Sequence, residues 1–219
     1  MTEVDRPGAE RWVPPDADVA ALRRAVPDCR GCELWRDATQ AVFSTGSPEA
    51  SVMLVGEQPG DREDREGEPF VGPAGRVLDD ALAAAGIARA DAYLTNAVKH
   101  FRFELRGKRR IHEKPAVGHL VACRPWLAAE LRAVHPSVVV GLGATAARSL
   151  LGSPVRLGDL RGRVLPPPEG APAPVVLTQH PSAVLRVRDA DERGAAFDAL
   201  VADLAIAAEA VKHPHSFAP

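Results

Sequence analysis

Short apolar runs and longer amphipathic stretches follow one another along this chain, and each pattern predicts one kind of secondary structure. The run Val52–Val55, which ends at Gly56, is typical of a strand that is buried on both faces. Apolar residues that recur every three or four positions indicate helices elsewhere. The expected strands are 52–55, 93–95, 138–140 and 175–178. The first expected helix is capped by Asp16 or Asp18 and ends near Pro27. The other expected helices are 74–85, 117–134, one that ends at Leu151, and about 191–211.

Strands that alternate with helices predict an α/β fold with a mainly parallel sheet. A chain of 219 residues is long enough for one such domain with short appendages. We expect a flexible N-terminus over residues 1–15, a single domain over 16–212 and a loose C-terminal tail over 213–219. The proline-rich segment 163–174 is expected to be a surface loop.

The composition narrows the possible environments and partners. No apolar run approaches the roughly 18 residues that a membrane span needs, so we expect no membrane partner. The first residues are polar and acidic and lack an apolar signal region, which predicts a cytoplasmic protein. The formal net charge of −2 gives no general attraction to polyanions, so any cationic cluster needs a local explanation.

Such a cluster surrounds one histidine, His112, in the segment KRRIH. A histidine is able to be neutral near pH 7 and can then act as a base or a nucleophile. The positive charges around it suit a phosphate backbone, although a solvated surface loop is the alternative. The cations are Arg102, Arg106, Lys108, Arg109, Arg110 and Lys114.

The three cysteines indicate a metal site or a redox pair. Cys29 and Cys32 form a CxxC motif, and Cys123 lies far from them in the sequence. The CxxC follows a helix-like segment, which argues against a thioredoxin-like pair. Three cysteines with one histidine suit structural zinc, and they suit an iron–sulfur cluster equally well, because spacing does not separate the two.

Unusual polar residues follow three of the four expected strands. They lie in the segments 56–60, 96–100 and 178–182. The carboxyl ends of parallel strands meet at one edge of a sheet, where ligands of α/β proteins usually bind. Ordinary turn chemistry is the alternative for each segment taken alone.

A glycine-rich turn, Gly141–Ala146, follows the third expected strand and matches the GxGxxA fingerprint of dinucleotide-binding proteins. That fingerprint normally sits on the first strand, with an acidic residue at the end of the next strand. Here Asp159 lies in a polar turn instead. Close packing of a helix on a strand explains the glycines adequately.

Five segments together resemble the iron–sulfur uracil-DNA glycosylases, the fourth family of the uracil-DNA glycosylase superfamily. The resemblance extends from about Cys29 to the last helix. At two places the chain departs from the pattern of this family and resembles one branch, the UdgX-type uracil-DNA-binding proteins. Gln58 stands where the family has alanine. His100, followed by a long loop that contains KRRIH, stands where the family has a cysteine and a short proline-rich loop. The five segments are GEQPGDREDREGEPFVGPAGRVLDDAL, TNAVKHF, ACRPWL, VVVGLGATAARSLLG and HPSAVLR.

The resemblance implies a three-layer αβα fold with a central, mainly parallel, four-stranded sheet. It also implies a 4Fe–4S cluster, since Cys29, Cys32 and Cys123 match three family ligands and His100 stands at the fourth. A solvent-facing His100 beside a three-cysteine cluster or a zinc ion is the alternative. The protein would act as a monomer on uracil-containing DNA, single- or double-stranded, with free uracil as product.

The resemblance also implies roles for single residues, and these roles place uracil at the carboxyl ends of the parallel strands. Phe70 would stack on the base, and Asn96 would read its O4 and N3 edge. His180 would donate to uracil O2, helped by backbone N–H groups around Gly56 to Gln58. Core packing is the alternative for Phe70, and capping of the final helix is the alternative for His180.

The UdgX-type departures imply that His112 attacks the sugar C1′ in place of water. Glu57 would accept the second ring proton, and Gln58 would help to orient the site. Asp61 would contribute to the site, or form a solvated acidic turn with Glu63, Asp64 and Glu66. The expected DNA contacts are Arg109 and Arg110 to flanking phosphates and, in the segment 180–186, Ser182 and Arg186, with 183–186 as a loop that enters the minor groove.

The resulting hypothesis is an enzyme that cleaves the N-glycosidic bond of uracil in DNA and stays covalently attached after a single turnover. A conventional multiple-turnover glycosylase is the first alternative. A non-catalytic DNA-binding module with a structural metal is the second.

Overall fold

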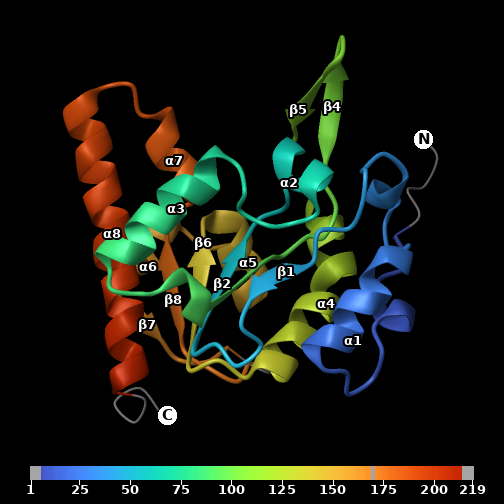
Figure 1. Cartoon of the computed structure of the whole chain (residues 1–219), viewed down its shortest axis with the longest axis horizontal. Coiled ribbons are helices and arrows are strands. Elements are labelled where there is room, and N and C mark those ends of the chain that lie inside the picture. The colour runs from blue at the N-terminus through green and yellow to red at the C-terminus, as the bar shows by residue number, and fades with distance from the viewer. Residues whose placement is uncertain (1–5, 169–170, 214–219) are drawn as a thin grey trace.

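The computed structural model describes residues 6–168 and 171–213, in which a six-stranded sheet lies between two layers of helices (Figure 1). The strand order is β1-β3-β2-β6-β8-β7. The four central strands are parallel, and an antiparallel strand is added at each edge. The strands of this sheet are β1 Ser44–Gly46, β2 Val52–Gly56, β3 Ala92–Asn96, β6 Val138–Leu142, β7 Val164–Leu165 and β8 Val175–Thr178.

The helices cover both faces of the sheet, which confirms the expected three-layer αβα fold around a parallel four-stranded core. α1 (Val19–Ala25), α4 (Val117–Val134) and α5 (Ala144–Leu151) pack on one face. α3 (Pro73–Ala84) and α8 (Ala190–Lys212) pack on the other. The shorter elements are α2 Asp61–Glu66, α6 Leu157–Leu160, α7 Pro181–Arg186 and the 3-10 turns η1 Glu10–Trp12, η2 Val26–Asp28, η3 Glu33–Arg36 and η4 Arg89–Asp91.

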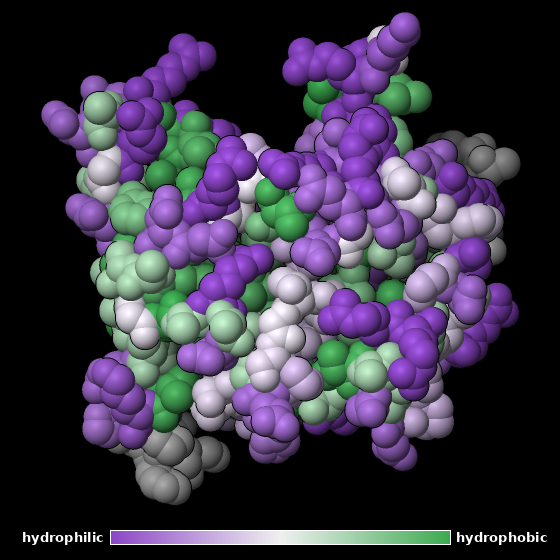
Figure 2. Space-filling model, in the orientation of Figure 1, coloured by the Kyte–Doolittle hydropathy of each residue, from purple (hydrophilic) through white to green (hydrophobic). Residues whose placement is uncertain are grey.

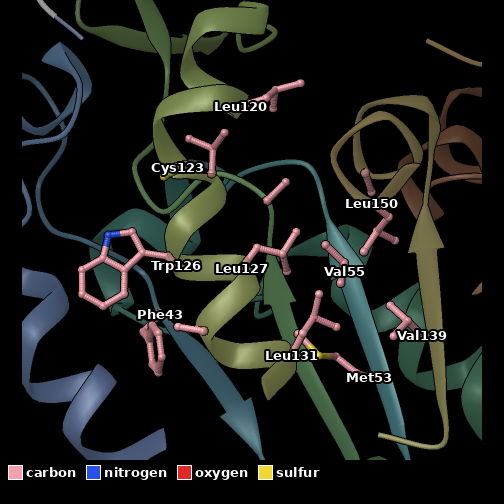
Figure 3. Close-up of a cluster of buried hydrophobic side chains, with 14 of the residues drawn as sticks. Phe43, Met53, Val55, Leu120, Cys123, Trp126, Leu127, Leu131, Val139 and Leu150 are labelled. Atoms are coloured by element: carbon pink, nitrogen blue, oxygen red, sulfur yellow. The ribbon is translucent and has the colours of Figure 1, made fainter. Parts of the chain in front are cut away.

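The central strand β2 shows why a continuous apolar run predicts a sheet buried on both sides. All five of its residues are buried, and alternate side chains enter different cores. Met53 and Val55 belong to the cluster under α4, whereas Val52 and Leu54 belong to the cluster under α3 and α8. Figure 3 shows Leu131 of α4 pointing toward Met53 and Val55.

The long elements lie close to the expected positions. Helix α1 begins after Asp18, whose Oδ1 accepts a hydrogen bond from Ala21 N–H at 2.7 Å. Helix α4 has the expected bounds, and Gly86, with φ of 75°, follows α3 as the expected helix stop. No helix in the described ranges combines the length and the apolar character needed to cross a membrane.

The KRRIH segment was expected to be a loop, and this expectation is wrong. β4 (Phe103–Arg106) and β5 (Arg109–His112) pair antiparallel as a hairpin that projects from the body of the molecule, as Figure 1 and Figure 2 show. Its two-residue turn includes Gly107, whose φ of 61° suits a tight hairpin turn. The guanidinium of Arg110 lies 5.0 Å from the centre of the Phe103 ring and helps to hold the two strands together.

Residues 183–186 were expected to be a loop and are instead part of α7. Pro181 at the first helical position favours this helix, and the His180 ring caps it by accepting the Ser182 N–H. His180 therefore caps a helix, but the short α7 rather than the final helix α8.

The expected domain boundaries at residues 15 and 212 stay predictions. Residues 1–5 and 214–219 lie outside those that the structure describes. In the remainder of the expected N-terminal segment, Ala9 is fully buried and Arg6 forms an ion pair with Glu33 at 2.6 Å. In the expected surface loop 163–174, Val164–Leu165 forms the edge strand β7, and residues 169–170 are not described.

Candidate active site

The carboxyl ends of the parallel strands border a cleft of about 890 Å³. The hairpin stands on one side of it, and α7 with the beginning of α8 stands on the other (Figure 2). Among the residues predicted to act in catalysis or to bind substrate, all in the described part of the chain, Gly56, Arg109 and Arg110 do not line this cleft. The predicted residues that line it are Glu57, Gln58, Asp61, Phe70, Asn96, His112, His180, Ser182 and Arg186.

Gly56 lets an amide and an aromatic ring approach each other at the end of β2. The strand register places Gly56 beside Asn96. A Cβ atom at Gly56 would lie 2.3 Å from Asn96 Oδ1 and 2.7 Å from Phe70 Cζ, which is closer than atoms tolerate. The Phe70 ring also lies near the His180 ring, with 6.4 Å between centroids and 28° between planes. Phe70, Asn96 and His180 thus converge in one part of the cleft.

The hydrogen bonds of His180 determine which ring nitrogen carries the proton. Nδ1 accepts the Ser182 backbone N–H at 3.1 Å and lies 2.8 Å from Ser182 Oγ. Burial lowers the pKa of His180 to about 4, so the ring is neutral near pH 7. A neutral ring whose Nδ1 accepts must carry its proton on Nε2, which becomes a donor. Arg186 supports the arrangement by donating to Ser182 Oγ at 3.0 Å.

This burial predicts a pH dependence of folding. The pKa of about 4 for folded His180 lies below the value of ~6.5 for an unfolded histidine, so the unfolded state binds protons first as pH falls. The stabilisation is complete above about pH 6.5 and is lost toward pH 4, with about 1–2 kcal/mol lost at pH 5. Urea unfolding at both ends of this range should show a smaller loss in His180→Gln. An equal loss in both proteins would contradict the assignment.

Glu57 and His112 face each other across the cleft. His112 Nε2 lies 3.4 Å from Glu57 Oε1, and the His112 side chain is 50% exposed. Burial acts to raise the pKa of Glu57, but His112 and the Thr145 hydroxyl outweigh it and hold that pKa below its usual range. Glu57 is therefore a carboxylate at neutral pH and is able to accept a proton from the imidazole.

Gln58 holds both ends of the segment that carries the hairpin. Its side-chain amide donates to the carbonyl oxygens of Arg102 and Glu113, each at 3.1 Å. Its Oε1 accepts the Arg102 N–H at 3.1 Å. One amide thus ties together the two chain ends between which His112 is presented, although these positions are far from Gln58 in the sequence.

The acidic turn is solvated only in part, because Glu66 is exposed and Asp61 is partly exposed, whereas Glu63 and Asp64 are buried. Asp64 is fully buried and accepts the Thr39 N–H at 3.0 Å, and Glu63 is buried and accepts the Gly72 N–H at 2.8 Å. The Arg110 guanidinium reaches Asp64 at 2.6 Å and Asp61 at 2.5 Å. These contacts join β5 to α2, and the fully buried Asp64 carboxylate in particular needs a cationic partner. Arg110 is occupied by them, whereas Arg109 on the same strand is exposed.

The three cysteines are free and buried, and two of them accept hydrogen bonds from nitrogen. Trp126 Nε1–H donates to Cys29 Sγ at 3.2 Å, and Lys99 N–H donates to Cys123 Sγ at 3.4 Å. Burial, together with the neighbouring Glu33 carboxylate, raises the pKa of Cys32 to about 11. Figure 3 shows Cys123 and Trp126 on α4 at the edge of the apolar core.

This donor set fits a thiolate-bound metal centre, because N–H groups directed at sulfur stabilise thiolate ligands. His100 is buried next to Lys99 in the chain, and burial lowers the pKa of its ring to about 4, which keeps it neutral. Among residues 6–168 and 171–213, no three His, Cys, Asp or Glu side chains are already gathered as metal ligands. The positions and the types of donor are compatible with zinc as well as with a cluster.

A buried ion pair that the sequence did not reveal supports Asn96. Lys99 and Glu130 are both fully buried and contact each other through Nζ and Oε2. Lys99 Nζ also donates to Thr95 Oγ1 at 2.6 Å and to the Asn96 carbonyl at 2.9 Å. The available signal was a charged residue, Glu130, at a position of α4 where the helical repeat predicts an apolar side chain.

Thr145 is a second residue that the sequence did not reveal. Its hydroxyl donates to Glu57 Oε2 from the first turn of α5. The available signal was its place in the glycine-rich turn Gly141–Ala146, directly after a buried strand.

Comparisons with known proteins show the family to which this chain belongs. The model of the uracil DNA glycosylase superfamily matches residues 43–205. The type-4 uracil-DNA glycosylase of Pyrobaculum aerophilum is 33% identical over 174 residues, which cover 77% of this chain and 85% of that protein. The type-4 enzymes of Archaeoglobus fulgidus (33% over 167 residues, 74% and 80%) and Thermotoga maritima (34% over 169 residues, 77% and 83%) are similar to the same extent. The chain therefore belongs to the uracil DNA glycosylase superfamily.

Proposed function

We propose that this protein excises uracil from DNA and then captures the abasic sugar covalently through His112. The observation that carries the proposal is the cleft itself, in which Phe70, Asn96 and His180 lie together with the His112–Glu57 pair. The relatives named type-4 uracil-DNA glycosylases support the excision step. Capture rests on the position of His112 beside a carboxylate.

Recognition requires that the uracil leaves the base stack and enters the cleft. Phe70 stacks on the ring, and the Asn96 amide pairs with its O4 and N3 edge. Cytosine presents the reversed hydrogen-bond pattern at this edge, and an unpaired buried amide costs about 1–3 kcal/mol. The lack of a side chain at Gly56 keeps this space open.

Cleavage breaks the bond between N1 of uracil and C1′ of the sugar, and the bonding electrons leave with the base. His180 stabilises the departing anion because its Nε2 carries the donor proton while Nδ1 accepts from Ser182. Backbone N–H groups near the end of β2 add to this stabilisation. Free uracil is the product of this step.

Capture forms a bond between an imidazole nitrogen of His112 and C1′ as positive charge develops there. The other ring nitrogen faces Glu57, which accepts its proton. A tethered neutral imidazole has a large advantage over bulk water as the nucleophile. The product is a neutral N-alkyl imidazole, which is a poor leaving group, so the protein turns over once.

The contacts of Gln58 support assignment to the UdgX-type branch. In this chain its amide makes three hydrogen bonds to the ends of the segment that presents His112. Alanine, which the resemblance gives as typical of the other type-4 proteins, has no group that makes them. Gln58 and the hairpin therefore act as one unit, and we place Gln58 as a residue that orients the site.

We further propose that Cys29, Cys32, Cys123 and His100 hold a 4Fe–4S cluster. A cluster bound there cross-links the turns η2 and η3 to α4 and to the segment after β3. The same segment contains Lys99, which contacts the Asn96 carbonyl. The cluster is thus structural, and the uracil-binding residues depend on it only through the fold.

Purified protein should be brown, with broad visible absorption from the cluster. Cys29→Ala should lose this absorption and much of its solubility, because it removes a ligand from a buried site. Iron, sulfide and zinc analysis together with the visible spectrum provides the measurement. A colourless wild-type protein with one equivalent of zinc would contradict the cluster and leave the uracil pocket unaffected.

The proposed function is tested by incubating the protein with a uracil-containing oligonucleotide and running a denaturing gel. A shifted band that survives heat and detergent is the expected result. Strand breakage after alkali without a shifted band would indicate a conventional glycosylase. Neither signal would indicate a DNA-binding module without catalysis. Gel filtration alongside tests the expectation that the protein acts as a monomer, and single- and double-stranded oligonucleotides test both expected substrates.

Electrostatic contacts with DNA should make the initial capture slower as the salt concentration rises. Arg109→Ala should reduce this dependence by about one counterion, because its exposed guanidinium is available to a phosphate. Arg110→Ala should change the salt slope less, because Asp61 and Asp64 already occupy that guanidinium. Capture rates over a salt series measure both slopes. Adducts that dissociate in high salt would rule out covalent capture.

A further inference from the structure

The middle of the glycine-rich turn Gly141–Ala146 lines the cleft, although close packing of a helix on a strand is enough to explain its glycines. Gly143, Ala144 and Thr145 line the cleft between Glu57 and His180. The turn is rigid, because the Gly143 N–H donates to the Thr178 carbonyl at 2.8 Å and the Gly143 carbonyl accepts the Ala147 N–H at 3.0 Å. Its residues are therefore able to position side chains on both sides of the cleft.

Gly143 provides the space on the His180 side. Its φ of 90° is a conformation that favours glycine, and a Cβ atom there would lie 3.1 Å from the His180 Cβ. The turn thus passes directly beside the residue that is proposed to stabilise the leaving base.

Thr145 provides a contact on the other side. It is buried, and its hydroxyl donates to Oε2 of Glu57, while Oε1 of the same carboxylate faces His112 at 3.4 Å. The Thr145 carbonyl accepts from Ser149 Oγ at 3.2 Å within α5. The two oxygens of Glu57 thus have different partners, one fixed by the fold and one directed at the nucleophile.

We propose that Thr145 is a positioning residue, which holds one oxygen of Glu57 so that the other faces His112 and so favours covalent capture over release. This inference rests on the proposed roles of Glu57 and His112. A carboxylate rotates readily about its last side-chain bond, and a hydrogen bond to one oxygen restricts that rotation. In the proposed mechanism His180 stabilises the departing base, whereas capture needs Oε1 of Glu57 to face His112.

The test compares Thr145→Val, which has nearly the same shape but no hydroxyl, with Thr145→Ser, which retains it. The measured quantity is the ratio of heat-stable adduct to free abasic product. We expect this ratio to fall about tenfold in Thr145→Val, as loss of a hydrogen bond to a charged group implies, and to recover in Thr145→Ser. A purely structural role would lower adduct and free product in proportion.

Thr178→Val is the matched control. It removes another buried hydroxyl that donates to a carboxylate, Asp203, at 2.6 Å. Its loss should lower the free energy of unfolding and leave the ratio of adduct to free product unchanged, because Asp203 does not contact Glu57 or His112.

A second measurement is independent of activity. The pKa of Glu57, followed by NMR of carbon-13-labelled carboxyl groups, should rise in Thr145→Val, because the hydroxyl that helps to lower it is lost, and return in Thr145→Ser. An unchanged Glu57 pKa overturns the inference, and so does an unchanged ratio in a protein that captures DNA. A wild-type protein that forms no adduct, with a Glu57 pKa that still rises in Thr145→Val, contradicts the proposed capture but supports the contact of Thr145 with Glu57.

Discussion

His112→Ser should convert a protein that acts once into a glycosylase that releases its product. The substitution removes the proposed nucleophile and leaves Phe70, Asn96 and His180 in place. Stabilisation of the leaving uracil does not depend on capture, so bond cleavage should continue. The shorter side chain should also leave room for a water molecule near C1′.

The measurement is the amount of uracil released per protein molecule, followed with the heat-stable gel band. Wild-type protein should stop at about one uracil per molecule, whereas His112→Ser should exceed this and show no heat-stable band. His213→Ser is the matched control. His213 follows the last residue of α8, contacts Glu209 of that helix and lies outside the cleft. A full adduct from His112→Ser would mean that another residue is the nucleophile.

Gly56→Ala should abolish both cleavage and capture. The added Cβ would lie 2.3 Å from Asn96 Oδ1 and 2.7 Å from Phe70 Cζ, so at least one of these groups must move. A displacement of about 1 Å at a reacting centre costs about 100-fold in rate, and we expect a loss at least this large. Both activities fall together because each requires bound uracil, in contrast to His112→Ser.

Single-turnover cleavage rates measure this effect. Gly158→Ala is the control, because a Cβ atom at Gly158 meets nothing within 4 Å. Circular dichroism and thermal unfolding establish that both variants are folded. A normal cleavage rate in Gly56→Ala would show that Asn96 and Phe70 do not bind the base.

The pattern of apolar and polar residues predicted the long elements well, because a buried strand needs a continuous apolar run and an amphipathic helix needs an apolar residue every three or four positions. β2, with every residue buried, could be recognised from Val52–Val55, and α4 has the expected bounds. Short elements such as the hairpin were missed because their residues show no such pattern. No residue of the two hairpin strands is fully buried, so their pairing depends on a turn and on contacts with α2 rather than on a strong hydrophobic repeat.

The resemblance to known families predicted which residue types reach the cleft, but the partners of those residues followed only from the fold. Arg110 was expected at a phosphate, and in the structure it pairs with Asp64, which lies 46 positions away. Asp64 was read as part of a solvated turn because acidic residues are usually exposed, yet it is fully buried.

The sequence by itself determined the α/β architecture, the strand ends that form the cleft and the presence of His112 among cations. Only the tertiary structure decided how His112 is held. Gln58 reaches Arg102 and Glu113 across 44 and 55 positions, and Thr145 reaches Glu57 across 88. Hydrogen bonds between such distant groups depend on how the strands and helices pack, and no local repeat encodes that packing.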